Sequence, residues 1–191
     1  MAGYEIDFIH PALDLANSQH GRGPDLLEDA RWFERYRAHW GYVAAGPPGA
    51  SSRTRLLELR VLLRRISETL DAGKTPEAAD LAQLDRVLGG ANVRRELSVE
   101  AGSLQLRLAP ARPDWRWVLS EIASSFVELL ARGEADRLKV CDNPECRFVF
   151  YDASKNRSRR WCAHTTCGNR HKVRRFRERQ RARARSERPP S

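Results

Sequence analysis

Four cysteines, arranged as two matched pairs, are the residues of this sequence with the clearest chemical meaning. Cys141 and Cys146 have four residues between them, Cys162 and Cys167 also have four, and fifteen residues lie between the pairs. Two thiolates from each of two tight turns can complete a tetrahedron around one Zn²⁺. The spacing therefore predicts a single structural zinc site with these four cysteines as ligands, and it places His164 outside the shell. An iron–sulfur cluster is the weaker alternative.

Positive charge is concentrated after the first cysteine pair. Residues 155–191 contain 14 Lys or Arg and 2 Asp or Glu, a net charge of +12. Residues 1–154 contain 20 Lys or Arg and 23 Asp or Glu, a net charge of −3. Such asymmetry indicates an anionic partner for the C-terminal segment, either nucleic acid or an anionic membrane surface. With a zinc module at its start, the segment favours nucleic acid, duplex DNA first and RNA as the alternative.

The segment after Cys167 is predicted to be a helix, because it contains no proline before Pro189. One face of this helix is expected to pack against the metal module. That face consists of Asn169, Val173, Phe176 and Gln180. His171 is expected to lie on the surface. Basic side chains around the second cysteine pair are expected to neutralise phosphates and release counterions. They are Arg159, Arg160, Arg170, Lys172, Arg174, Arg175, Arg177 and Arg181.

The spacer between the cysteine pairs is expected to form a hairpin. Phe148 and Phe150 alternate around Val149 as in a strand, and residues 157–161 are expected to return to the metal as the second arm. Phe148, Phe150 and Trp161 would provide a small apolar core. A module of this size needs its metal in order to fold.

Residues 1–137 are predicted to form a mostly helical domain. Apolar residues recur at three- and four-residue spacing in four stretches that carry helix start or stop signals. The predicted helices lie at 25–40, 55–70, 76–89 and 112–133. A turn-rich connector is expected at 44–52. The fold class is therefore α+β, with helices dominant.

Two further segments of this domain are expected to be ordered. Alternating apolar residues on either side of Ala101–Gly102 predict a small β-hairpin within 94–110. Residues 1–20 are expected to be a short lead-in with packed apolar side chains. Those side chains are Ile6, Phe8, Leu13 and Leu15.

Two parts of the sequence resemble known families. The segment CGNR at 167–170, preceded by RRWC and followed by HKVRRFRERQR, resembles the CGNR zinc finger, and CDNPECRFVFYDASKNRSRRWC is similar to the rest of that module. The stretch ALDLANSQHGRGPDLLEDARWFERY resembles the start of the ABATE domain. It has Leu13-Asp14-Leu15-Ala16-Asn17-Ser18 where that family usually has Leu-Asp-Phe-Val-Asn-Thr.

The resemblance implies a bacterial transcriptional regulator, in a family linked to stress responses, with a zinc-ribbon or treble-clef-like finger that ends in a basic, DNA-binding helix. It assigns the metal to the same four cysteines. Gly168 would permit the turn from metal to helix and Asn169 would brace it. The implied domains are an ABATE-like domain at 1–137, a finger with its basic helix at 138–185, and a disordered tail at 186–191.

The N-terminal domain is expected to bind a small-molecule effector or to mediate a homodimer. Asn17, His20 and Arg22, near a turn, are the candidate effector ligands. No nucleophile-elbow or phosphate-loop motif occurs, and four thiolate ligands leave no open zinc position for water, so no enzyme activity is expected. The alternative function is an RNA-binding or ribosome-associated zinc-finger protein.

Localisation is expected to be cytoplasmic. No run of about 18 apolar residues occurs, so no membrane span is predicted. The N-terminus has acidic residues where a signal peptide needs basic ones. Thiols stay reduced in the cytoplasm, which favours metal binding over disulfides.

Overall fold

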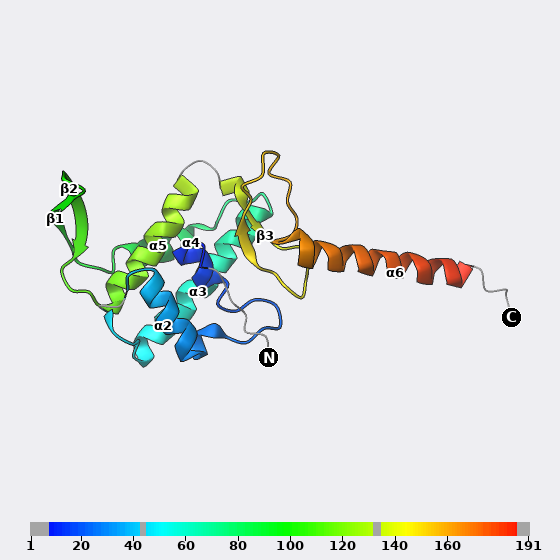
Figure 1. The fold of residues 1–191 in the computed structure, drawn as a ribbon, viewed down its shortest axis with the longest axis horizontal. Helices are drawn as coiled ribbons and strands as arrows, with labels where there is room; N and C mark the ends of the chain where they lie inside the picture. Colours follow the sequence, from blue (N-terminus) through cyan, green and yellow to red (C-terminus); the bar gives the residue numbers. More distant parts are fainter. Residues whose placement is uncertain (1–7, 43–44, 132–134, 187–191) are drawn as a thin grey trace.

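A computed structural model describes residues 8–42, 45–131 and 135–186, with the backbone alone for 182–186. Figure 1 shows a helical body from which a β-hairpin and a long C-terminal helix project. The helices are α1 (Pro11–Ala16), α2 (Ala30–His39), α3 (Ala50–Asp71), α4 (Ala78–Leu88), α5 (Trp115–Ala131) and α6 (Asn169–Ser186), with short turns η1 (Leu26–Glu28), η3 (Ala135–Arg137) and η4 (His164–Gly168). The strands are β1 (Val93–Glu100), β2 (Ser103–Pro110), β3 (Leu138–Val140) and β4 (Val149–Tyr151). The predicted α+β class is confirmed.

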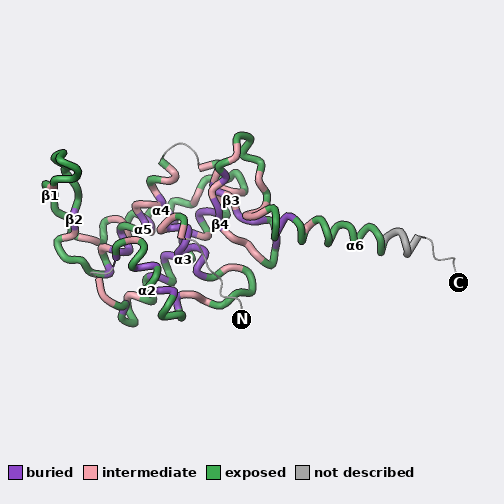
Figure 2. The backbone as a smooth tube through the Cα atoms, viewed as in Figure 1, coloured by how far each residue is buried: buried purple, intermediate pink, exposed green. Residues whose placement is uncertain are grey.

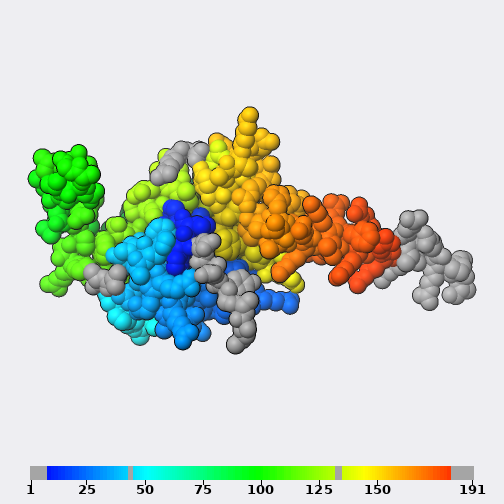
Figure 3. Space-filling model, in the orientation of Figure 1, coloured from blue at the N-terminus to red at the C-terminus, as the bar shows by residue number. Residues whose placement is uncertain are grey.

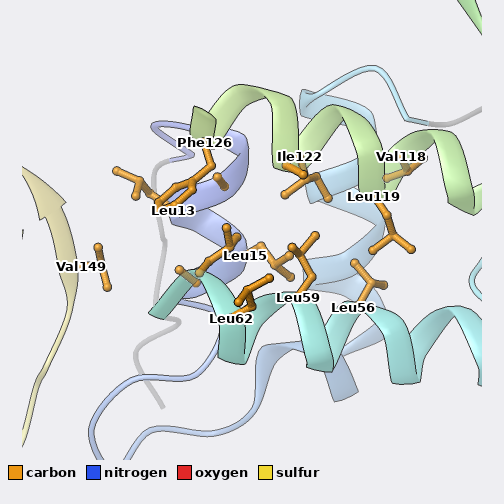
Figure 4. Close-up of a cluster of buried hydrophobic side chains, with 14 of the residues drawn as sticks. Leu13, Leu15, Leu56, Leu59, Leu62, Val118, Leu119, Ile122, Phe126 and Val149 are labelled. Atoms are coloured by element: carbon orange, nitrogen blue, oxygen red, sulfur yellow. The ribbon is translucent and has the colours of Figure 1, made fainter. Parts of the chain in front are cut away.

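The core is built around α1, a short helix in what the sequence suggested was a simple lead-in. Leu13 and Leu15 of α1 are buried between α3 and α5, where they meet side chains such as Leu59 and Ile122 (Figure 4). Pro11 occupies the first helical turn, where its missing N–H costs nothing. Burying each such aliphatic side chain contributes about 1.5–3 kcal/mol. Ile6, also expected to pack, lies outside the described residues.

Two helices start five residues away from the predicted position. Helix α2 begins at Ala30, because Asp29 caps it through the N–H groups of Arg31 and Trp32, while Asp25, where the predicted helix began, caps the turn η1. Helix α3 begins at Ala50, within the expected connector, since its Ala and Ser residues tolerate helix. The predicted end of α5 at Gly133 lies outside the described residues.

The hairpin β1–β2 forms as predicted. Its strands pair antiparallel with Glu100 opposite Ser103, and the turn residues Ala101 and Gly102 have φ of 49° and 79°. Positive φ at both positions is the pattern of a type I′ turn, whose twist matches that of the strands. Figure 2 shows the hairpin as an almost wholly exposed arm at one end of the molecule.

The expected hairpin within the cysteine spacer is wrong in its pairing. Strand β4 pairs antiparallel with β3, which precedes the first cysteine, and Val140 lies opposite Val149. Residues 157–161 are not a strand. The reason is apolar burial: Leu138, Val140 and Val149 all enter the main core, whereas 157–161 is mostly arginine and serine.

The finger and the helical body share one core and a set of polar bridges. The Asn17 side chain donates to the carbonyl of Val149 and accepts from its N–H, both at 2.8 Å. Arg64 donates to the carbonyls of Ala16 at 3.0 Å and Arg147 at 2.9 Å. Among the described residues, no helix is long and apolar enough to cross a membrane.

We expect Asn17→Ala to destabilise the whole chain by about 2–5 kcal/mol, since it leaves the buried N–H and carbonyl of Val149 without partners at about 1–3 kcal/mol each. Urea unfolding monitored by circular dichroism measures this. Asn92→Ala, at an exposed position, is the matched control and should change stability by less than about 0.5 kcal/mol. Equal stability of the two variants would show that the hydrogen bonds between Asn17 and Val149 do not stabilise the fold.

Candidate metal centre and basic helix

The four cysteine sulfurs converge on one point. All four Sγ atoms lie within 4.8 Å of one another, with Cys146–Cys162 at 3.7 Å and Cys162–Cys167 at 3.8 Å. Sulfurs at about 2.3 Å from Zn²⁺ form a tetrahedron with edges of about 3.8 Å. The cluster therefore has the donor set and size of a single structural zinc site, as predicted. Cys141 and Cys167 are buried, and the other two are half-buried.

The first cysteine pair lies on a tight turn that follows β3. The Cys141 N–H donates to the carbonyl of Phe148 at 2.9 Å, which continues the β3–β4 ladder to the metal. The Asn143 carbonyl accepts from Cys146 N–H at 2.8 Å, and its side-chain Nδ2 lies 3.5 Å from Cys167 Sγ. Hydrogen bonds to a thiolate stabilise its charge and hold its orientation.

The second pair leads straight into the basic helix. Cys167 sits in the π-helical turn η4, and Gly168 donates its N–H to the carbonyl of Ala163 at 3.1 Å. Asn169 Nδ2 donates to the carbonyl of Thr165 at 3.1 Å, so it braces this turn as the resemblance implied. Helix α6 starts at that residue, and the metal ligand fixes the direction of its first turn.

The thiols cannot all ionise without a cation. Hydrogen bonds from Cys146 and Cys162 lower the pKa of Cys141, whereas donating to Cys141 raises the pKa of Cys146 to about 12. Hydrogen bonds with Cys141 and Cys146, together with burial, also raise the pKa of Cys162. Zn²⁺ would replace these protons and stabilise four thiolates in one place.

The small core of the finger is as predicted. Phe150 is buried with Cys141 and Cys167, and Phe148 and Trp161 pack against them. His164 is exposed, in agreement with its place outside the shell. His171, expected on the surface, is instead half-buried, with its ring 5.2 Å from that of Trp161.

Of the three residues proposed as effector ligands, two contact the finger and one is exposed. The Asn17 amide holds Val149, and the His20 ring lies 5.1 Å from that of Phe148, so both contact the finger. Arg22 is exposed. Gly21, between them, has φ of +57° and approaches the cysteine turn so closely that a Cβ there would lie 1.9 Å from the carbonyl oxygen of Glu145. Sequence patterns gave no signal of this contact.

The basic residues fall into two groups. Those on α6 are exposed: Arg170, Lys172, Arg174, Arg175, Arg177 and Arg181. Arg159, which is half-buried, and Arg160, which is exposed, contact side chains of the finger. The Arg159 guanidinium lies 5.1 Å from the Phe150 ring centre, while Arg160 pairs with Asp142 at 2.5 Å and lies over Trp161.

The expected packing of α6 against the finger is wrong for its apolar residues. Val173 is 48% exposed and Phe176 55% exposed, and Gln180 is exposed as well. The helix leaves the body at η4 and continues into solvent (Figure 3). A groove of about 780 Å³ follows its base, lined by residues that include Asn143, Thr166, Arg170 and Arg174. Exposed apolar and cationic side chains thus lie together on α6.

This fold and site define a zinc-finger protein with a helical N-terminal domain. Residues 137–180 match the family model described as "CGNR zinc finger", and residues 9–133 match ABATE, described as "Putative stress-induced transcription regulator". The chain belongs to the ABATE family and carries a C-terminal CGNR zinc finger. No curated protein matches the chain.

We expect Gly21→Ala to weaken zinc binding as well as stability, because the new methyl group meets the Glu145 carbonyl and must displace the first cysteine turn. Gly73→Ala is the matched control: Gly73 has a similar φ of +68° but open space around its Cβ position, so only backbone strain of about 1–2 kcal/mol is added. Zinc affinity is measured by competition with a chelator. Equal zinc affinities in the two variants would contradict the contact.

Cys162→Ser should release the zinc, and it should lower the melting temperature of the body as well, since β3 and β4 supply Leu138, Val140 and Val149 to the main core. Elemental analysis gives the zinc content, expected to be one ion per wild-type chain, and calorimetry gives the melting temperature. Thr165→Ala, at an exposed neighbouring position, should retain both values. Zinc retained by Cys162→Ser would refute the four-thiolate site.

Proposed function

We propose that this protein is a DNA-binding transcriptional regulator whose helix α6 enters the major groove of duplex DNA. The observation that carries the proposal is a helix that begins two residues after a zinc ligand, leaves the body, and exposes its arginines from Arg170 to Arg181. An α-helix with its side chains is about 10–12 Å wide, which fits a major groove of about 12 Å. Phosphates would neutralise the many positive charges of α6, of which Glu178 balances only one within 169–181.

The scarcity of acidic residues in α6 supports the proposal that this helix binds DNA. Within 169–181 the single carboxylate is Glu178, which lies 3.8 Å from Arg174. The exposed apolar residues Val173 and Phe176 lie among the arginines, where they could meet thymine methyl groups. Arginines near the base of the helix could bind guanine edges in a bidentate manner.

Duplex DNA is favoured over double-stranded RNA for a geometric reason. The major groove of A-form RNA is deep and too narrow for a helix with long side chains. RNA binding remains the second candidate, because exposed Phe176 and the pocket of about 290 Å³ beside Trp161, Lys155 and Arg160 could accept unstacked bases.

We propose that the N-terminal domain influences the finger through the loop around Gly21. An effector bound by exposed Arg22 would act next to the contact between Gly21 and Glu145, and so on the first cysteine turn. The role is one of binding, in the cytoplasm, with zinc as a structural ion and no catalysis.

Arg174→Ala combined with Arg177→Ala should weaken DNA binding and reduce the slope of log affinity against log salt by about two units, because two phosphate contacts are lost. Fluorescence anisotropy over a salt series measures the slope. The matched control is Arg55→Ala with Arg86→Ala, which removes two exposed arginines from α3 and α4. If both double variants shift the slope equally, binding is not through α6.

Selection from random duplex DNA with the zinc-loaded protein should enrich a defined motif at roughly physiological salt, where non-specific binding is weak. A parallel selection from random RNA is the comparison. Enrichment from RNA alone would replace the DNA proposal by the RNA alternative, and no enrichment from either would leave only charge-driven binding.

A further inference from the structure

The β1–β2 hairpin has one face that is apolar and uncovered. Because paired residues of an antiparallel ladder lie on one face, the pairing Leu97↔Leu106 and Val99↔Leu104 places these side chains together. The apolar residues of this face are 46–71% exposed: Val93, Leu97, Val99, Leu104, Leu106 and Leu108. No other part of the described chain shows so many exposed large apolar residues in one element pair.

The opposite face of the hairpin is polar and already satisfied by its own ion pairs. Arg94 lies 3.6 Å from Glu96, and Arg107 lies 3.8 Å from Glu100. This face suits water. An isolated two-stranded hairpin is at best marginally stable and needs packing on its apolar side. The contrast between the two faces therefore indicates that a partner covers the apolar face.

We propose that the apolar face of this hairpin is a homodimer interface, packed against the same face of a second copy. The six side chains expose on the order of 700 Å² per chain, close to the roughly 800 Å² that each partner contributes to a stable interface. Exposed apolar patches larger than a few hundred Å² mark interaction sites in soluble proteins. Two such faces form a small four-stranded sandwich of the usual layer type.

Charge favours the antiparallel orientation of the second copy. With the Leu97–Leu106 pair at the two-fold axis, the Arg95–Leu108 pair of one chain opposes the Val99–Leu104 pair of the other. Arg95 is exposed and is the one charge on the apolar face, and this arrangement places it opposite the Val99 end of the second hairpin. The two Arg95 side chains thereby lie at opposite ends of the interface, whereas a parallel orientation would place these like charges at the same end.

The position of the hairpin suits this role. It lies at the end of the molecule opposite to α6 (Figures 1 and 2), so a dimer formed through it leaves both basic helices accessible. The inference does not depend on DNA binding, and its test contains no nucleic acid.

Sedimentation velocity tests the interface. Wild-type protein should have twice the mass of the 21.8 kDa chain at micromolar concentration, and Leu97→Glu with Leu106→Glu should be monomeric. The control is Val61→Glu with Leu81→Glu, two exposed apolar residues on helices, which should stay dimeric. A monomeric wild type, or a dimeric Leu97→Glu/Leu106→Glu variant, overturns the proposal.

A charge-complementation experiment guards against a variant that merely disrupts the hairpin. Leu97→Lys with Leu106→Lys should also be monomeric alone. Mixed with the Glu variant, it should form a 1:1 heterodimer, because the two-fold axis brings the substituted positions face to face. Failure of the mixture to associate, with both variants folded by circular dichroism, counts against this interface.

Discussion

The pair of hydrogen bonds between the Asn17 side chain and Val149 is the link on which the arrangement of the molecule depends. Strand β4 turns the N–H and carbonyl of Phe148 towards β3, as the bond from Cys141 shows, so those of Val149 point to the other edge. Asn17 fills that edge in place of a third strand. A three-residue strand could not persist alone, and here it is bound on both sides.

This link explains the residues of the segment that resembles the ABATE signature. Asp14 accepts from the N–H of Ile9 at 3.1 Å and from Trp40 Nε1 at 3.0 Å, while burial raises its pKa to about 6. Ser18 Oγ accepts from Arg60 at 3.1 Å. Asp14, Asn17 and Ser18 therefore fix α1 between the body and the finger. Their polar atoms satisfy backbone groups, the Trp40 indole and the Arg60 guanidinium.

Local patterns in the sequence predicted what local physics determines. The long amphipathic helices, the Ala101–Gly102 turn and the cysteine spacing are short-range signals, and they hold in the structure. Helix α1 was missed because six residues are too few to show a periodicity. The predicted partner of β4 was wrong, because strand pairing is decided by which apolar side chains reach the common core. That contact joins residues distant in the sequence. The contact between Gly21 and Glu145 likewise needs the fold before it can be seen.

Helix α6 poses a stability problem that its metal and its proposed ligand solve together. Most helices gain their stability from packing, yet this one exposes Val173 and Phe176 and packs mainly on η4. Arginines four residues apart, such as Arg170 and Arg174, repel one another. The zinc site offsets the cost of nucleation by fixing the turn through Cys167. Phosphates would remove the repulsion, so under the proposed function charge that destabilises the isolated helix would contribute to binding DNA. A cysteine pair directly before a basic helix is the arrangement that this balance requires.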